Sequence, residues 1–234
     1  MAATSDIHSP RYLPLLREAT VSYQGSPCAL ILAGDLVDRG IVSSLKPVLD
    51  ILRGKFPETP IIAVFGNEEY HDREDEFRRG YPEITWLDDD YTILECGEEN
   101  LAIIGTRGAL QRPTRWQRRH MPWLERVYRE RPAIIARLID EARREASRVV
   151  LVSHYALSRK TIEGEPPRIW PELYSPLMEK VVVEKKPDAA IHGHAHNGKP
   201  YAIVAGVPVY NVALPLNKRL VTVKAGRRSI LDYA

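Results

Sequence analysis

The chain has 234 residues, a formal net charge of +2 at neutral pH, 44% hydrophobic residues and 27% charged residues. This balance is typical of a globular protein, and no apolar run approaches the roughly 20 residues that a membrane-spanning helix needs. The small net charge does not by itself indicate a nucleic-acid or membrane partner. We therefore expect residues 1–234 to form a single domain with no membrane span.

The N-terminus and the cysteines bear on the cellular compartment. Residues 1–6 lack both the basic start and the apolar stretch of a secretory signal. Cys28 and Cys96 are the only cysteines, and both lie beside apolar strand-like runs. We expect them to be reduced, the alternative being a bridge between them. These features favour a cytoplasmic protein.

Strand and helix signals alternate in the first third of the chain, which predicts an α/β layered fold. Two apolar runs read as buried strands because each is short and ends abruptly at a glycine followed by a polar residue. In chain order, the expected elements are a short strand before Asp6, a helix over 10–20, a strand over 28–33, a helix over 41–52 closed by Gly54, and a strand over 60–65.

The rest of the chain continues the alternation and ends in short strands separated by glycine turns. Pro132 is expected to divide or kink one of its helices, because proline removes a backbone donor. The expected elements are a hairpin of 91–95 with 101–105, a helix over 122–146, a strand over 148–153, a helix over 173–183, a strand over 189–191, and antiparallel strands over 201–205, 207–212, 220–224 and 229–232.

Side chains capable of binding metal follow most of these strands. Because the carboxyl ends of strands in an open α/β sheet lie at one edge, these distant segments can converge on one site. Taken singly, each residue has a simpler interpretation as a helix cap, a turn residue or a buried histidine. The candidate metal ligands are Asp6, His8, Asp35, Asn67, His154, His194 and His196.

The chemistry of this set restricts the metal. Carboxylate, imidazole and amide ligands without cysteine suit manganese, iron or zinc, and they exceed what one tetrahedral ion can use. Two divalent ions about 3.5–4 Å apart, bridged by a carboxylate, are an arrangement used for phosphoester hydrolysis. We choose Asp35 as the bridging ligand.

The same residues carry a family resemblance. Asp6-x-His8, the stretch 34–40 (Gly-Asp-Leu-Val-Asp-Arg-Gly), Gly66-Asn67, His154 and the stretch 193–196 (Gly-His-Ala-His) resemble, in order, the signature blocks of the calcineurin-like metallophosphoesterases. The resemblance implies a four-layer αββα sandwich of two mixed sheets flanked by helices, with the strands after His196 completing the second sheet.

The resemblance also implies roles for individual residues. The first ion would be held by Asp6, His8 and His196, the second by Asn67, His154 and His194, and Asp35 would bridge both. Within the stretch 34–40, Arg39 would bind a phosphoryl oxygen, and Asp38 would orient a neighbouring catalytic side chain. The alternative for Arg39 is a surface salt bridge.

One departure from the family pattern follows Asn67. Most members have a histidine there that contacts phosphate and helps protonate the leaving group, whereas this chain has Glu68. One hypothesis is that Glu68 is protonated, because burial and Asp38 would raise its pKa, and that it donates to the leaving oxygen. The other is that His71 or His120 reaches in from a loop.

An arginine-rich stretch near residues 107–132 is expected to be an insertion. Its simpler interpretation is a solvated helix and loop, and its functional interpretation is an electropositive rim for an anionic substrate. Trp116 and Trp123 lie among these arginines. They could stack on bases, so a nuclease acting on a single strand is the runner-up interpretation.

The sequence thus predicts a dinuclear-metal-dependent phosphoesterase that hydrolyses a phosphodiester or a small phosphomonoester by attack of a metal-bridging hydroxide. The missing histidine favours diesters or substrates with good leaving groups. The alternative outside the enzyme class is a degenerate, non-catalytic relative that serves as an interaction scaffold.

Overall fold

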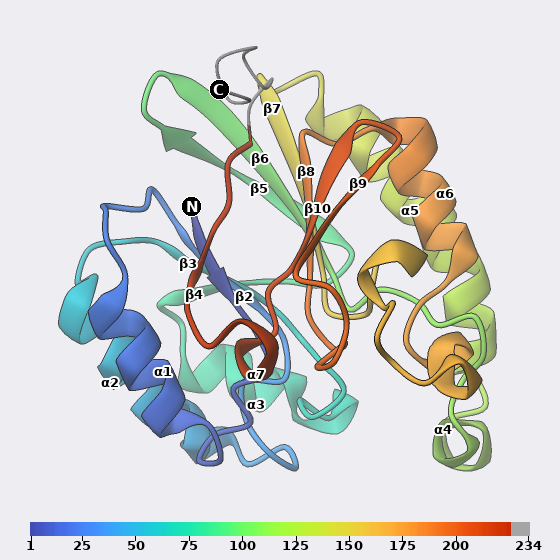
Figure 1. The fold of residues 1–234 in the computed structure, drawn as a ribbon, viewed down its shortest axis with the longest axis horizontal. Helices are drawn as coiled ribbons and strands as arrows, with labels where there is room; N and C mark the ends of the chain where they lie inside the picture. Colours follow the sequence, from blue (N-terminus) through green and yellow to red (C-terminus); the bar gives the residue numbers. More distant parts are fainter. Residues whose placement is uncertain (226–234) are drawn as a thin grey trace.

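Two β-sheets pack face to face in the computed structural model, which describes residues 1–225, and helices cover their outer faces (Figure 1). The first sheet has the order β11-β1-β2-β3-β4, and all neighbours are parallel except β11, which runs antiparallel to β1. Its strands are β1 (Ala2–Thr4), β2 (Leu30–Ala33), β3 (Ile61–Val64), β4 (Ile84–Leu87) and β11 (Val221–Thr222).

The second sheet has the order β5-β6-β7-β8-β10-β9. Its four inner strands are parallel, and an antiparallel strand flanks them on each side. Its strands are β5 (Asp90–Cys96), β6 (Glu99–Thr106), β7 (Arg148–Ser153), β8 (Ala189–His192), β9 (Tyr201–Val204) and β10 (Val207–Asn211).

Helices from separate parts of the chain cover the two sheets. Helices α1 (Leu13–Ser22), α2 (Leu45–Lys55) and α3 (Glu74–Gly80) pack on the first sheet, and α5 (Leu124–Ala142) and α6 (Pro176–Lys185) pack on the second (Figure 1). The short helices are α4 (Arg115–His120), α7 (Leu214–Asn217) and 3-10 turns over Val42–Ser44, His71–Arg73, Arg159–Thr161 and Pro167–Glu172. The predicted αββα sandwich of two mixed sheets is confirmed.

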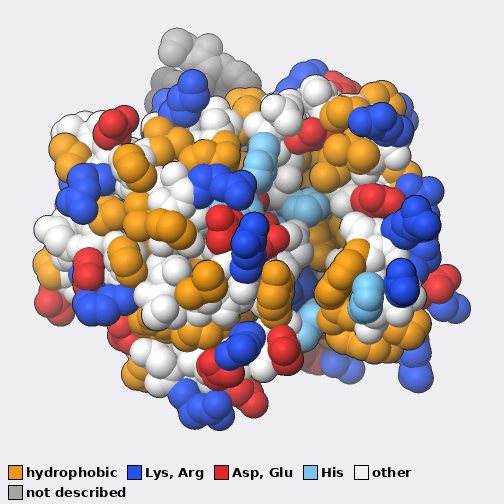
Figure 2. Space-filling view, turned by 90° about the horizontal axis from the view of Figure 1, so that it is seen from below, with side chains coloured by type: hydrophobic (Ala, Val, Ile, Leu, Met, Phe, Trp, Pro, Cys, Tyr) orange, Lys and Arg blue, Asp and Glu red, His pale blue; other side chains and the backbone are white. Residues whose placement is uncertain are grey.

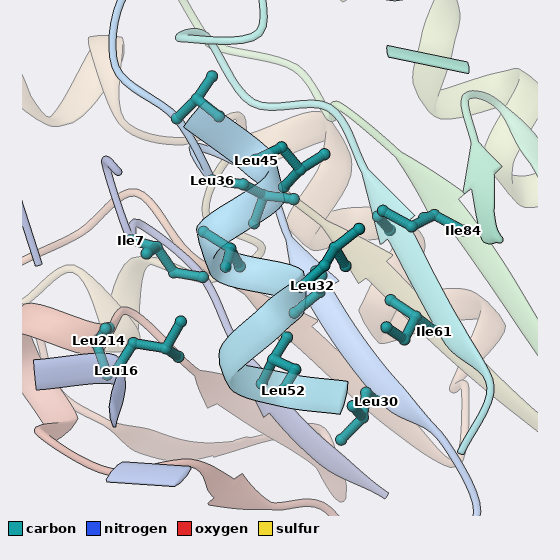
Figure 3. Packing of buried hydrophobic residues seen from close by; sticks show 14 of the residues in the cluster. Ile7, Leu16, Leu30, Leu32, Leu36, Leu45, Leu52, Ile61, Ile84 and Leu214 are labelled. Atoms are coloured by element: carbon teal, nitrogen blue, oxygen red, sulfur yellow. The ribbon is translucent and has the colours of Figure 1, made fainter. Parts of the chain in front are cut away.

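Strands β2 and β3 are unbroken apolar runs because both of their faces are buried. Along β2, Leu30 and Leu32 face the helices, whereas Ile31 and Ala33 face the second sheet. Figure 3 shows the first of these layers, with Leu45 and other side chains of α2 lying over the strands. Full burial of each leucine or isoleucine contributes about 1.5–3 kcal/mol, so the layers fix the position of the strand ends.

Several expected elements lie where the sequence placed them. The expected hairpin forms between β5 and β6, and β7 has the expected bounds. Two details were wrong. Pro132 lies within α5, which continues on both sides of it, and Gly54 lies inside α2 and does not close it.

The C-terminal strands divide between the sheets. Strands β9 and β10 complete the second sheet as expected, but β11 pairs with β1 in the first sheet. The reason is that β1 otherwise has an unpaired edge there. The strand expected over residues 229–232 lies outside the described residues. Strand β4 and helix α3 were not anticipated.

The expectation of reduced cysteines was wrong. Cys28 and Cys96 form a disulfide, with Cα atoms 5.4 Å apart and a sequence separation of 68. Cys28 precedes β2 of the first sheet and Cys96 ends β5 of the second, so face-to-face packing of the sheets brings them together. Among residues 1–225, no helix combines the length and apolarity that crossing a bilayer demands.

Candidate metal centre

The candidate ligands follow strands whose carboxyl ends lie at one edge of the sandwich. Asp35 and Asn67 follow the parallel strands β2 and β3, and His154 directly follows β7. The structure brings all seven candidate ligands of the sequence to this edge, in two clusters that share Asp35. Figure 2 views this edge and shows histidine side chains along a furrow between two lobes.

The first cluster consists of Asp6, His8 and His196, whose ligand atoms all lie within 4.8 Å of one another. His196 Nε2 lies 3.0 Å from Asp6 Oδ1. His8 Nε2 is buried without a hydrogen-bond partner, and His8 Nδ1 lies 3.0 Å from Asp38 Oδ1. Asp38 therefore holds the imidazole with its second nitrogen directed at the cluster, as outer carboxylates do for metal-binding histidines.

The second cluster consists of Asp35, His154 and His194. His154 Nδ1 lies 2.9 Å from the carbonyl oxygen of Ala33, so the Nε2 atom is left for an ion. Asn67 Oδ1 lies 3.1 Å from that Nε2 atom and completes the cluster. The ligand atoms are thus oriented by contacts outside the cluster.

Asp35 lies between the clusters. Its Oδ1 atom is 3.5 Å from His154 Nε2, and its Oδ2 atom is 3.8 Å from His8 Nε2. The two oxygens of one buried carboxylate therefore face different clusters. This is the geometry that a bridging ligand requires.

The backbone at these ligands is unusual. Asp6, His8, Asp35 and His194 all have positive φ angles, of 55°, 45°, 51° and 67°. Non-glycine residues rarely adopt this region, and such conformations cost about 1–3 kcal/mol each, so they concentrate at functional sites. The strand-end loops also approach closely, because a Cβ atom on Gly34 would lie 2.7 Å from the backbone nitrogen of Gly66.

Glu69 holds two of these loops together, a role that the sequence did not reveal. Its fully buried carboxylate accepts four backbone N–H bonds at 2.7–3.1 Å. The donors are Asp35, Leu36, Val37 and Gly66. Two adjacent glutamates follow Asn67, and nothing in the sequence says which of them faces inward.

Arg107 supports the same loops from the second sheet. Its guanidinium donates to the carbonyl oxygens of Gly66 and Glu69 and pairs with Glu74 at 2.5 Å. The side chain is buried. Arg107 therefore stabilises the loop that carries Asn67 and is not part of an electropositive rim.

The buried charges of the site shift each other's protonation. Burial, followed by the charges of Glu69 and Asp6, raises the pKa of Asp35 well above its usual range. Burial acts in the same direction on Asp6, but the hydrogen bond from His196 and the charge of His154 outweigh it and lower the pKa of Asp6. Burial lowers the pKa of His154 to about 3, so its imidazole is neutral and able to bind a metal.

These properties fit two divalent ions. Buried carboxylates that face each other need positive charge nearby, and the unpartnered Nε2 atom of His8 needs an acceptor of its lone pair. The donors are oxygens and imidazole nitrogens, which suit ions such as manganese, iron or zinc. The residues present therefore fit the metal pair that the sequence predicted.

The remaining predicted residues lie around the clusters. Asp38 contacts His8, and its other oxygen lies 3.5 Å from Arg11, an exposed cation that the sequence reasoning missed. The Arg39 side chain is exposed and makes no hydrogen bond or ion pair within residues 1–225. Glu68 is half-buried, and its carboxylate accepts the backbone N–H of Arg39 at 2.7 Å.

A cavity of about 790 Å³ opens beside the second cluster. Asn67, Glu68 and His194 line one side of it. His71 and His120, the alternative proton donors, also line it, as do residues of the arginine-rich stretch. Of the two interpretations of that stretch, the electropositive rim is not found at the cavity, because Arg107 is the only lysine or arginine among the described lining residues.

The sandwich and its two ligand clusters define a protein of the metallophosphoesterase class. A profile of the calcineurin-like phosphoesterase family matches residues 1–198, and the chain belongs to this family. The family resemblance drawn from the sequence blocks is thereby confirmed. No curated protein matches the chain by sequence.

Solved structures share the fold at low identity. Phosphopantetheinyl hydrolase from Mycobacterium tuberculosis has 17% identity and a TM-score of 0.71, with 94% of each chain covered. A putative 5'-nucleotidase from Staphylococcus aureus has 17% identity and a TM-score of 0.59 over 90% of this chain and 47% of its own. GAP50, described as the anchor in the inner membrane complex of Plasmodium, has 10% identity and a TM-score of 0.56 over 92% and 71%.

Proposed function

We propose that the protein hydrolyses a phosphodiester or a small phosphomonoester with the help of two divalent metal ions. The observation that carries this proposal is the position of Asp35, whose two oxygens face one ligand cluster each. A carboxylate placed in this way can bind one ion with each oxygen. The family supports the same reaction class.

The ligand assignment follows the clusters. Asp6, His8 and His196 would hold the first ion, Asn67, His154 and His194 the second, and Asp35 both. When bound, such an ion pair supplies Lewis acidity and a water activated for attack on phosphorus.

The surrounding side chains position the ligands and the substrate. The Asp38 carboxylate accepts a hydrogen bond from Nδ1 of His8 and thereby fixes the orientation of the imidazole ring. The guanidinium of Arg39, free of other partners among residues 1–225, binds a phosphoryl oxygen with its fork of donors. We expect Arg39→Ala to raise KM more than it lowers kcat.

Protonation of the leaving group is assigned to Glu68, which lines the cavity beside Asn67. If Glu68→Gln leaves turnover and its pH profile intact, this role is wrong. His71 is then the next candidate, because it lines the same cavity, although its Nδ1 atom lies 2.8 Å from Glu74.

Two alternatives differ in what they require. A non-catalytic scaffold would tolerate loss of the metal ligands. The fold likeness to the Plasmodium anchor protein is the observation that favours this alternative. A nuclease would require cations along a groove, but the described cavity lining offers none that is unpaired. The complete ligand set favours the enzyme over the scaffold.

The test is hydrolysis of bis(p-nitrophenyl) phosphate by purified protein with manganese. We expect activity above background, and its loss by more than about 100-fold in Asp35→Ala and His154→Ala. Asp50→Ala is the matched control, because Asp50 is an exposed acid whose ion-pair partner among residues 1–225 is Lys46 alone. Equal activity in all of these variants would sink the assignment.

Three further features belong to the proposal. We take manganese as the first metal to assay, and residues 1–234 as one domain whose arginine-rich stretch near 107–132 forms the cavity wall. We still propose a cytoplasmic location, although the Cys28–Cys96 disulfide means that reduced cysteines no longer argue for it. Disulfides do occur in cytoplasmic proteins of heat-adapted organisms.

A further inference from the structure

The cavity beside the second cluster is mostly apolar. A group esterified to a phosphate at the metal centre would extend into it, because Asn67 and His194 line both. Its volume of about 790 Å³ suits an organic group of the size of typical ligands. The apolar and aromatic lining residues include Leu110, Trp116, Met121, Trp123, Leu124 and Tyr155.

Two tryptophans among these lining residues, Trp116 and Trp123, are unusually exposed; we call the side of the cavity that they form the tryptophan wall. Trp116 is 60% and Trp123 is 48% exposed, although large aromatic side chains normally bury most of their surface. Each ring packs against a histidine that also lines the cavity. The ring centroids of Trp116 and His120 are 4.8 Å apart, and those of Trp123 and His71 are 5.1 Å apart. The aromatic surfaces are therefore held in place and still accessible.

The segment that carries Trp116, at the start of α4, is held in place by several hydrogen bonds. Thr114 and Gln117 form a reciprocal capping box at the start of α4. The Gln117 side chain is buried and lies 3.3 Å from the hydroxyl of Tyr155, which belongs to the loop after β7. Arg118 bonds back to the carbonyl oxygen of Pro113. Such anchoring lowers the entropy cost of binding, because the wall is formed before the ligand arrives.

The charges of the cavity exclude a polyanion. Glu68, Asp72 and Glu172 are the acidic residues among the described lining, and Arg107 is its only lysine or arginine. The guanidinium of Arg107 is already bound to Glu74 and to backbone carbonyls. No unpaired guanidinium or ammonium group in this lining can receive a second phosphate.

We propose that the cavity binds an uncharged, flat aromatic ring in the organic part of the substrate, and that Trp116 and Trp123 set the preference for it. The ring belongs either to a nucleoside or to a simple aryl group, which share this chemistry. The proposal rests on the proposed phosphoester hydrolysis for the position of the phosphate.

The test compares esters that differ only in the ring. Adenosine 5'-monophosphate and ribose 5-phosphate both release a primary 5-hydroxyl group, and benzyl and cyclohexylmethyl phosphate carry a flat aromatic and a puckered aliphatic six-membered ring. With manganese, we expect kcat/KM to favour the aromatic member of at least one pair by about tenfold, a typical effect of one stacked ring. The first pair reports a nucleoside ring and the second a simple aryl ring.

Variants of the two tryptophans test whether they cause the preference for the aromatic ester. Trp116→Ala and Trp123→Ala should each reduce it to about threefold or less. Leu177→Ala is the matched control, because Leu177 is 48% exposed on α6 and does not line the cavity. It should keep the full preference.

Binding separates this inference from the proposed function. Adenosine and naphthol are not phosphate esters, so their affinity can be measured by calorimetry whether or not the protein is active. Binding of either that weakens about tenfold in Trp123→Ala supports the ring site even if no ester is hydrolysed, a result that would contradict only the proposed function. Equal rates for both pairs, or in an inactive protein no binding of either ring compound, would overturn the inference.

Discussion

Replacing Glu69 with glutamine should destabilise the protein strongly, although the change replaces one oxygen by an NH₂ group. The Oε1 atom of Glu69 accepts the N–H groups of Leu36 and Val37, and the Oε2 atom accepts those of Asp35 and Gly66. In Glu69→Gln one of these atoms becomes a donor. Two buried N–H groups then lose their acceptor whichever way the amide is turned.

The size of the effect follows from those two groups. Each buried donor left without a partner costs about 1–3 kcal/mol, so the free energy of unfolding should fall by about 2–6 kcal/mol. The neighbouring Glu68→Gln is the matched control, because the Glu68 carboxylate accepts a single hydrogen bond at a half-buried position. That variant should lose less than about 1.5 kcal/mol.

The assay is urea unfolding of the metal-free proteins, followed by calorimetric titration with manganese. We expect Glu69→Gln to bind manganese more weakly, because Glu69 ties the loop of Asp35 to that of Gly66. A loss of stability in Glu69→Gln no greater than in Glu68→Gln would refute the proposed role of this carboxylate.

Further predictions concern protonation, the disulfide and the outer carboxylate. Burial lowers the pKa of His192 to about 4, so His192 stays neutral in the folded state while the unfolded chain takes up a proton. The free energy of unfolding should therefore fall by roughly 1.4 kcal/mol per pH unit from about pH 6.5 towards pH 4. His192→Gln should remove this part of the pH dependence, measured by urea unfolding at each pH. Opening the Cys28–Cys96 bridge, which spans 68 residues, should cost up to about 4 kcal/mol of unfolding free energy, measured with and without reductant. Asp38→Ala should weaken manganese binding about 10–100-fold in calorimetry through misorientation of His8, and unchanged affinity would exclude that role.

The sequence was most informative where burial leaves a clear signal. The strands β2, β3 and β7 are buried on both faces, so they appear as short apolar runs that end at polar residues. Parallel pairing then places their carboxyl ends at one edge, which is why the approximate location of the candidate site followed from the positions of Asp35, Asn67 and His154.

The features that the sequence did not reveal depend on contacts between distant segments. The Cys28–Cys96 bridge requires the face-to-face packing of the two sheets, and Arg107 reaches its partners from the opposite sheet. The inward turn of Glu69 depends on loop conformation that no periodicity encodes. The tryptophans were visible in the sequence, but their interpretation changed because the surrounding arginines do not line the cavity.

The central claim is a two-ion centre bridged by Asp35, and the most direct measurement is the number of manganese ions bound per chain. Elemental analysis after equilibrium dialysis should give two ions for the native protein and fewer than two for Asp35→Ala, with Asp50→Ala unchanged. Binding of a single ion by the native protein, or of two ions by Asp35→Ala with native affinity, would contradict the account.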